Sequence, residues 1–152
     1  MRVIPPDMEA WLTGYVRAAA QHDEVTVDVT NKEPPGLTVK PTKPLIVIRD
    51  DSGPQTGPTT FQRSIGASVL AGTRLDDKPV NDLARWLAAL LFDQDLPLVD
   101  GSPIAAVIMG GCNGPYSVAE QADIARRYLT AQYIVTGSWG AEKGDSDGEP
   151  TD

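Results

Sequence analysis

The chain has 152 residues, enough for one domain with a single buried core. Hydrophobic residues make up 41% of it and charged residues 22%, which predicts a soluble globular protein, and no apolar run approaches the length of about eighteen residues that spans a bilayer. The formal net charge of −8 argues against a protein that wraps a nucleic-acid backbone. The lone Cys112 can form no internal disulfide, and no secretory signal is evident, so we expect synthesis in a reducing cytoplasm.

The first predicted element is a helix that begins near Pro5 and Pro6, where the missing N–H groups cost a first turn nothing. Asp7 and Glu9 place carboxylates beside the positive end of its dipole. An apolar stripe at helical spacing follows, made by Met8, Trp11, Leu12, Tyr15, Val16 and Ala19. This stripe predicts packing on a sheet, and a partner-binding stripe is the less common alternative.

Strands and two long loops are predicted next. Residues 24–30 alternate valines with polar residues, as a half-buried strand does, and residues 45–48 form a continuous apolar run typical of a more central strand. Residues 61–72 resume extended patterning after a stretch rich in glycine and proline, so the two segments predict a β-hairpin with a long tip. Four prolines in residues 31–44 predict a surface loop. We expect this loop and the hairpin tip to have few internal partners.

The second half predicts a helix and two further strands. Asp76 or Asp77 can cap a helix that ends near Phe92, and residues 104–109 read as a short buried strand. Residues 112–115 predict a turn, residues 117–125 either a short helix or a loop, and residues 127–137 a long final strand. The order α-β-β-β-α-β-β predicts an α+β fold, with a mixed, mainly antiparallel sheet of about five strands packed by two main helices.

The domain organisation is one folded unit and a tail. Residues 1–139 form the predicted α+β domain. Residues 140–152 carry five acids against one lysine and no large apolar residue, so we expect a disordered acidic tail that holds about half of the net charge.

The chemistry-bearing residues form no recognisable catalytic or metal motif. His22 has no second histidine or cysteine at a zinc-ligand spacing, and the acids from Asp93 to Asp100 lack the glycine and the final glutamate of a calcium loop. No glycine-rich phosphate loop occurs, and Cys112 has no evident base in its own segment. The sequence therefore predicts no cofactor, no metal and no enzymatic activity.

Several phrases resemble one protein family. They are RVIPPDMEAWLTGYVR at the start, PLIVIRDD, SIGASVLAGT followed by a helix containing LARWLAALL, and the closing RRYLTAQYIVTG. Together they resemble the tail terminator proteins of long-tailed, siphovirus-type phages of actinobacteria, over residues 2–137. The acidic tail and the proline-rich loops match nothing in that pattern.

The resemblance implies a small α+β fold and a structural role in the virion. Such proteins assemble in the host cytoplasm as a hexameric ring on the head-proximal end of the tail tube, stop its growth, and contact the major tail tube protein and the head-tail connector or stopper. Alternatives are another neck component, such as a stopper or head-completion protein, and a small host enzyme or ligand-binding domain. Charged residues near strand ends are the predicted subunit or partner interface: Arg49, Asp50, Asp51, Arg63, Arg126 and Arg127.

Overall fold

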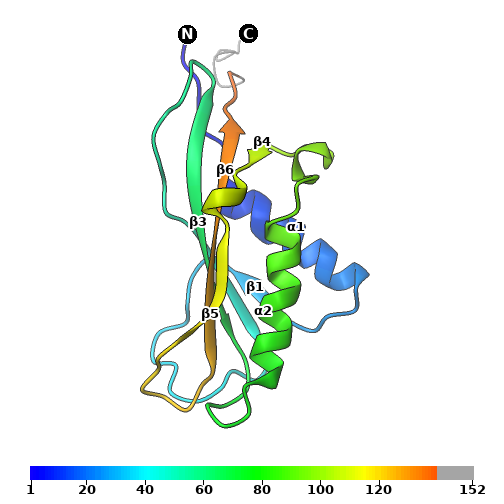
Figure 1. The fold of residues 1–152 in the computed structure, drawn as a ribbon, viewed down its shortest axis with the longest axis vertical. Helices are drawn as coiled ribbons and strands as arrows, with labels where there is room; N and C mark the ends of the chain where they lie inside the picture. The colour runs from blue at the N-terminus through cyan, green and yellow to red at the C-terminus, as the bar shows by residue number, and fades with distance from the viewer. Residues whose placement is uncertain (140–152) are drawn as a thin grey trace, which may run out of the picture.

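The computed structural model describes residues 1–139 and has two layers. A six-stranded mixed sheet forms one layer, and the helices α1 (Met8–His22) and α2 (Lys78–Leu91) cover one of its faces (Figure 1). This architecture confirms the predicted α+β class, with one strand more than expected. The predicted acidic tail at 140–152 lies outside the described residues. Neither helix is long and apolar enough to cross a bilayer.

The sheet has the spatial order β1-β2-β3-β6-β4, and β5 also pairs with β6. Its strands are β1 (Asp28–Thr30), β2 (Leu45–Asp50), β3 (Thr60–Leu70), β4 (Ile104–Val107), β5 (Asn113–Val118) and β6 (Arg126–Thr136). β1 runs parallel to β2, and every other pair is antiparallel. β2 and β3 form the predicted hairpin.

The long pair β3–β6 is the spine of the molecule. The two eleven-residue strands pair along their whole length, from Thr60 opposite Thr136 to Leu70 opposite Arg126. On its other side β6 pairs with β5 near its start and with β4 near its end. The short 3-10 turn η2 (Met109–Gly111) separates β4 from β5. Figure 1 shows β3 and β6 extending past the helices toward the end where both termini lie.

Helix α1 begins where the sequence predicts. The Asp7 side chain accepts a hydrogen bond of 3.0 Å from the Ala10 N–H, which satisfies one of the free donors of the first turn. The buried face carries Met8, Leu12, Thr13, Val16 and Ala20. Trp11 and Tyr15, from the same predicted stripe, are only partly buried, because they lie at the border of that face.

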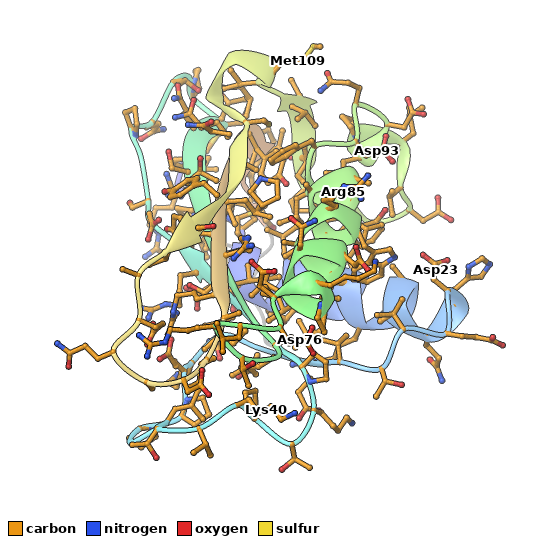
Figure 2. All side chains as sticks on the ribbon, turned by 60° about the horizontal axis from the view of Figure 1, so that its bottom comes forward. Asp23, Lys40, Asp76, Arg85, Asp93 and Met109 are labelled. Atoms are coloured by element: carbon orange, nitrogen blue, oxygen red, sulfur yellow. The ribbon has the colours of Figure 1, made fainter. Side chains whose placement is uncertain are left out.

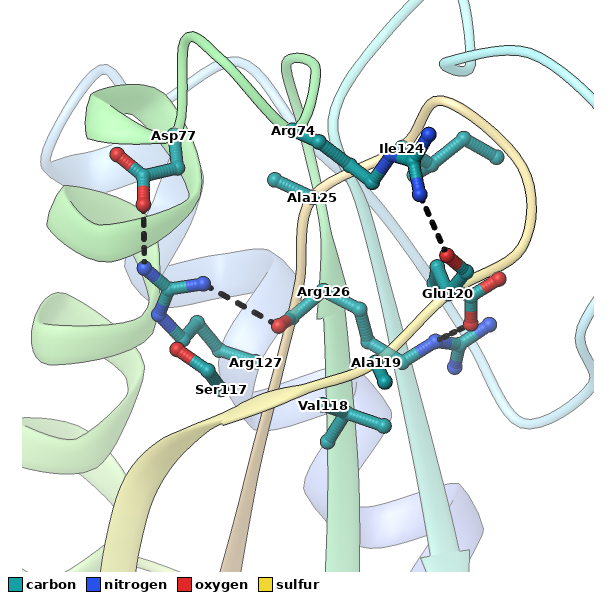
Figure 3. A pocket seen from close by; sticks show the side chains of 10 residues that line it. All are labelled: Arg74, Asp77, Ser117, Val118, Ala119, Glu120, Ile124, Ala125, Arg126 and Arg127. Atoms are coloured by element: carbon teal, nitrogen blue, oxygen red, sulfur yellow. Dashed lines mark hydrogen bonds and ion pairs between the residues drawn. The ribbon is translucent and has the colours of Figure 1, made fainter.

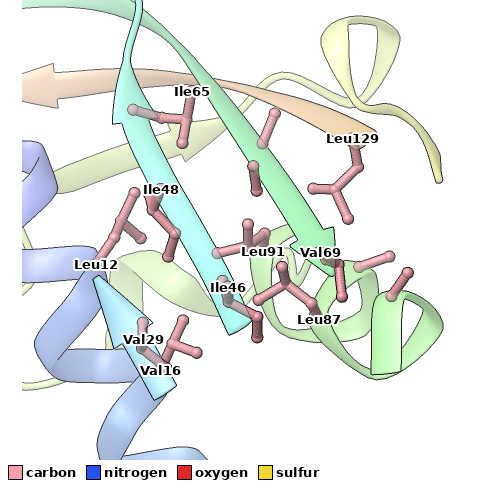
Figure 4. Close-up of a cluster of buried hydrophobic side chains, with 14 of the residues drawn as sticks. Leu12, Val16, Val29, Ile46, Ile48, Ile65, Val69, Leu87, Leu91 and Leu129 are labelled. Atoms are coloured by element: carbon pink, nitrogen blue, oxygen red, sulfur yellow. The ribbon is translucent and has the colours of Figure 1, made fainter. Parts of the chain in front are cut away.

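The main core lies between the sheet and both helices (Figure 4). Figure 4 shows Leu12 and Val16 of α1 beside Val29, Ile46 and Ile48, and Leu87 and Leu91 of α2 beside Val69. Tyr133 of β6 is fully buried here, and its hydroxyl donates a hydrogen bond of 2.6 Å to the Leu91 carbonyl at the end of α2.

A second apolar cluster lies on the opposite face of the sheet. Strand alternation turns Leu45 and Val47 away from the helices, and they pack with Leu70 and Ile124. Leu37, from the loop at 31–44, and Ala122 add to this cluster. The proline-rich loop and the segment 119–125 therefore cover one end of the outer face.

One predicted strand and one predicted turn are wrong in detail. The strand expected over 24–30 is reduced to Asp28–Thr30, because Glu24 has a φ of +57° and the Val25 N–H bonds back to the Ala20 carbonyl of the helix. The turn expected at 112–115 is replaced by β5. Of the two alternatives for residues 117–125, the loop is confirmed over 119–125, and residues 117 and 118 belong to β5.

Both long loops have internal partners, contrary to expectation. The hairpin tip continues beside β3, with hydrogen bonds of 2.8 Å from the Asp51 N–H to the Ser64 carbonyl and from the Gln62 N–H to the Pro54 carbonyl. The loop at 31–44 forms a bridge between Val39 and Asp123. Distant segments supply these partners, so local composition does not reveal them.

Candidate functional site

The six predicted interface residues lie in two groups. Arg49, Asp50, Asp51 and Arg63 lie beside the middle of the β3–β6 pair, and Arg126 and Arg127 lie at one of its ends. Asp50 ends β2, Asp51 follows it, and Arg63 lies in the part of β3 beyond the end of β2. Arg126 and Arg127 begin β6, where it pairs with the far end of β3. The structure therefore does not unite the six in one site.

The first group contains an ion pair at the start of the hairpin tip, the connection of residues 51–59 between β2 and β3. Arg63 Nε lies 3.7 Å from the Asp50 carboxylate, and the Arg63 guanidinium carbon lies 5.2 Å from the centre of the Phe61 ring. Its Nη1 also donates a hydrogen bond of 2.9 Å to the Gly53 carbonyl. Only 11% of the Arg63 side chain is exposed. Because it contacts both Asp50 and the Gly53 carbonyl, this residue fixes the start of the hairpin tip.

Glu9 of α1 joins this group, although the sequence suggested only a role beside the helix dipole. Its carboxylate accepts hydrogen bonds of 2.8 Å from the Asp50 N–H and 3.0 Å from the Asn31 side chain, and it lies 3.5 Å from Arg49 Nε. The Asp50 hydrogen bond is the main cause that lowers the pKa of Glu9, and Asn31 and Arg49 add to it. Glu9 thus ties α1 to β2 and to the proline-rich loop.

Asp51 faces the outer side of the sheet beside Tyr128. A Cβ built on Gly66 would lie 2.0 Å from the Tyr128 hydroxyl and 2.8 Å from an Asp51 carboxylate oxygen, so glycine is needed for this close approach. Burial, and then the nearby Asp51 carboxylate, raise the pKa of Tyr128. Tyr116 of β5 packs edge-on against the same ring, with the ring centres 5.8 Å apart.

The second group is an ion cluster centred on Arg126 (Figure 3). Its Nη1 and Nη2 donate hydrogen bonds of 2.9 Å each to the two carboxylate oxygens of Glu33, and its Nε donates to Glu120. These hydrogen bonds, that with Glu33 above all, raise the pKa of Arg126. Because Glu33 and Glu120 come from the two covering segments, Arg126 holds both against the end of the sheet.

Arg127 and Arg74 complete this end. Arg127 Nη2 donates a hydrogen bond of 3.0 Å to Asp77, which precedes α2 and makes no side-chain capping bond of its own. The Arg74 guanidinium donates a hydrogen bond of 3.2 Å to the Glu120 carbonyl. The three arginines line an open hollow of about 290 Å³ together with Asp77 and Glu120. Their charge is therefore used inside the subunit and does not form a free basic patch.

Of the six predicted residues, Arg49 and Asp51 remain the most accessible. The Arg49 side chain is 62% exposed, whereas those of Arg126 and Arg127 are 13% and 14% exposed. The roles of Glu9, Glu33 and Glu120 at these sites were not predicted from the sequence. The local pattern around a charged residue does not indicate which distant residue it will contact.

Metal-ligating side chains form no candidate group within residues 1–139. His22 is exposed at the end of α1 and lies 3.0 Å from Asp23, whereas Cys112 is partly buried after η2 and donates to the Ile108 carbonyl. No protein-family profile matches the sequence, and no curated protein is significantly similar to it.

Proposed function

We propose that the chain is a structural protein of a phage tail, a tail terminator that forms a ring on the head-proximal end of the tail tube. In this role it stops tube growth and presents the surface that joins the tail to the head. The resemblance across residues 2–137 carries the proposal. The α+β fold agrees with what that resemblance implies.

The surface of the subunit supports an assembly role. Large apolar side chains are exposed at several places, among them Leu98 at 80%, Met109 at 68%, Val39 at 67% and Trp139 at 52%. Burying such groups drives subunit association. They lie on different elements, which suits the two dissimilar surfaces that a closed ring requires of each subunit.

The proposed partners are further copies of the chain in a hexamer, the major tail tube protein and the head-tail connector or stopper. Within residues 1–139, Arg49 and Asp51 are the predicted interface residues best placed to contact them, because both lie at the surface near the start of the hairpin tip. The other four predicted residues would act mainly within the subunit. Asp50 and Arg63 would hold the hairpin tip in place, and Arg126 and Arg127 would hold the covering loops and the start of α2.

Electron microscopy of a phage that lacks this gene tests the proposal. A terminator predicts overlong, headless tail tubes, and normal tail length should return when the wild-type gene is supplied in trans. Tails of normal length that fail to join heads would instead identify another neck component. Normal virions would exclude both roles and favour a host enzyme or a ligand-binding domain.

Mass in solution gives an independent measurement. The purified chain should form a ring either alone or when isolated tail tubes are added, and the added mass per tube end should correspond to one ring. A chain that stays monomeric and leaves tube ends bare would contradict the proposal.

A further inference from the structure

Helix α1 carries an open aromatic groove at the border of its buried face. Trp11 and Tyr15 stack with their ring centres 5.2 Å apart and their planes within 7° of each other. Together with Ala10, Gly14, Val99 and Asp100 they line a hollow of about 320 Å³, called the aromatic groove below. A Cβ built on Gly14 would meet no atom within 4 Å, so nothing in the described subunit fills the space above it.

The rim of the aromatic groove is acidic. Asp100 belongs to its lining. Burial is the main cause that raises the pKa of Tyr15, and the nearby Asp93 carboxylate raises it further. Neither aspartate forms an ion pair with a basic residue of the part of the chain that the structure describes. A positively charged apolar segment would therefore complement this surface.

The proline-rich loop presents such a segment, here called the proline turn (residues 32–40). Pro34 and Pro35 are exposed, and Gly36 follows in a turn with a φ of +70°. The neighbouring Glu33 is neutralised by Arg126, whereas Lys32 and Lys40 are exposed and make no ion pair within residues 1–139. The Arg126 cluster thus fixes one end of the proline turn, in which the two prolines lie between Lys32 and Lys40.

We propose that the proline turn of one copy docks in the aromatic groove of the next copy, and that this is one contact of the ring. The inference rests on the proposed function. Proline rings pack against aromatic side chains in many peptide-binding grooves, and here the two lysines face the acidic rim. Figure 2 shows Lys40 and Asp93 well apart, with α2 between them in this view, so the two surfaces do not meet within one copy.

A second copy is a better occupant than the chain's own acidic segment. Residues 140–152 carry five acids and one lysine, which gives them the same sign of charge as the groove rim. A contact between two different surfaces also repeats from copy to copy and closes into a ring when the rotation permits.

Two variants separate the two sides of the contact. Gly14→Gln should fill the groove without disturbing the fold, since the site is open and glutamine favours a helix more than glycine does. Pro34→Ser with Pro35→Ser should remove the tip. Each variant alone should fail to form rings, whereas a mixture of the two should form dimers, because each pair keeps one intact groove and one intact turn. Gly110→Gln, at another open glycine, is the matched control.

A peptide of residues 31–41 tests the contact without the ring. It should shift the Trp11 indole resonance of the wild-type chain, bind Gly14→Gln about tenfold or more weakly, and bind less when serines replace its prolines. Rings formed by Gly14→Gln at the wild-type level would overturn this contact and leave the proposed function intact. Loss of rings in Gly14→Gln without any peptide binding would overturn the proline turn as the occupant and would mean that another segment of the next copy contacts the groove. Peptide binding without rings under any condition would support the contact and overturn the ring.

Discussion

The buried Tyr133 hydroxyl gives the sharpest test of how the core is held together. Tyr133 has no exposed surface, and its hydroxyl donates a hydrogen bond of 2.6 Å to the Leu91 carbonyl. That carbonyl belongs to the last turn of α2, where helical carbonyls have no partner within the helix, and Leu91 is itself fully buried. Tyr133→Phe therefore leaves a buried acceptor unsatisfied, and we expect it to lower the free energy of unfolding by about 1–3 kcal/mol.

The same residue predicts a change in pH dependence. Burial is the main cause that raises the pKa of Tyr133 far above its ordinary value. The folded state thus keeps the proton that the unfolded state loses, so the stabilisation is complete below the unfolded pKa of about 10 and is lost as the pH rises above it. This one group contributes a loss of about 1.4 kcal/mol per pH unit in that range, and Tyr133→Phe should lack that part of the slope.

Urea unfolding near neutral pH and at a series of pH values above about 10 measures both effects. Tyr116→Phe is the matched control, because it removes the same hydroxyl group from a tyrosine that is 46% exposed. Equal stability of Tyr133→Phe and the wild type at neutral pH, together with equal alkaline slopes, would refute the reasoning.

Three further predictions concern the outer face and the ion pairs. Gly66→Ala should lower stability by about 1–3 kcal/mol in thermal unfolding, because the new Cβ would strike the Tyr128 hydroxyl. Adding Tyr128→Phe should recover part of that loss, and an unchanged midpoint in the single variant would contradict the close packing. Arg126→Met should speed amide exchange in residues 31–44 and 119–125, since it frees Glu33 and Glu120; unchanged protection would mean that other contacts hold these loops. Arg63→Glu should lower the melting temperature because its 11% exposed side chain faces Asp50, whereas Arg49→Glu, at a 62% exposed side chain, should change stability by less than about 1 kcal/mol. The reverse ranking would contradict the burial argument.

The elements that could be predicted from the sequence are those whose own residues carry the pattern. α2 repeats apolar residues at helical spacing, and β6 alternates Leu129, Ala131, Tyr133 and Val135 toward the core, so both were located within a residue or two. β5 reads NGPYSV and is mostly exposed, so it has no such alternation; it becomes a strand only because β6 offers a hydrogen-bonding edge. The short β1 likewise depends on pairing with β2.

The candidate site was less accessible to sequence reasoning. The hairpin correctly placed Asp50 near Arg63, because strand pairing follows from a local pattern. The hydrogen bond from the Asp50 N–H to Glu9 joins residues 41 positions apart, and that from Arg126 to Glu33 joins residues 93 positions apart. Such pairings are set by the tertiary fold, so the charges could be identified but not their partners.

The β3–β6 spine has a mechanical consequence. Its hydrogen bonds lie across the strands, and the hairpin tip and the covering loops stand at its opposite ends. A tensile load passed from one end of the subunit to the other would act along the strands and strain all the rungs of this ladder together, in shear. The rungs would then share the load instead of opening one after another. A subunit built in this way resists stretching along its long axis far better than it resists peeling from one end.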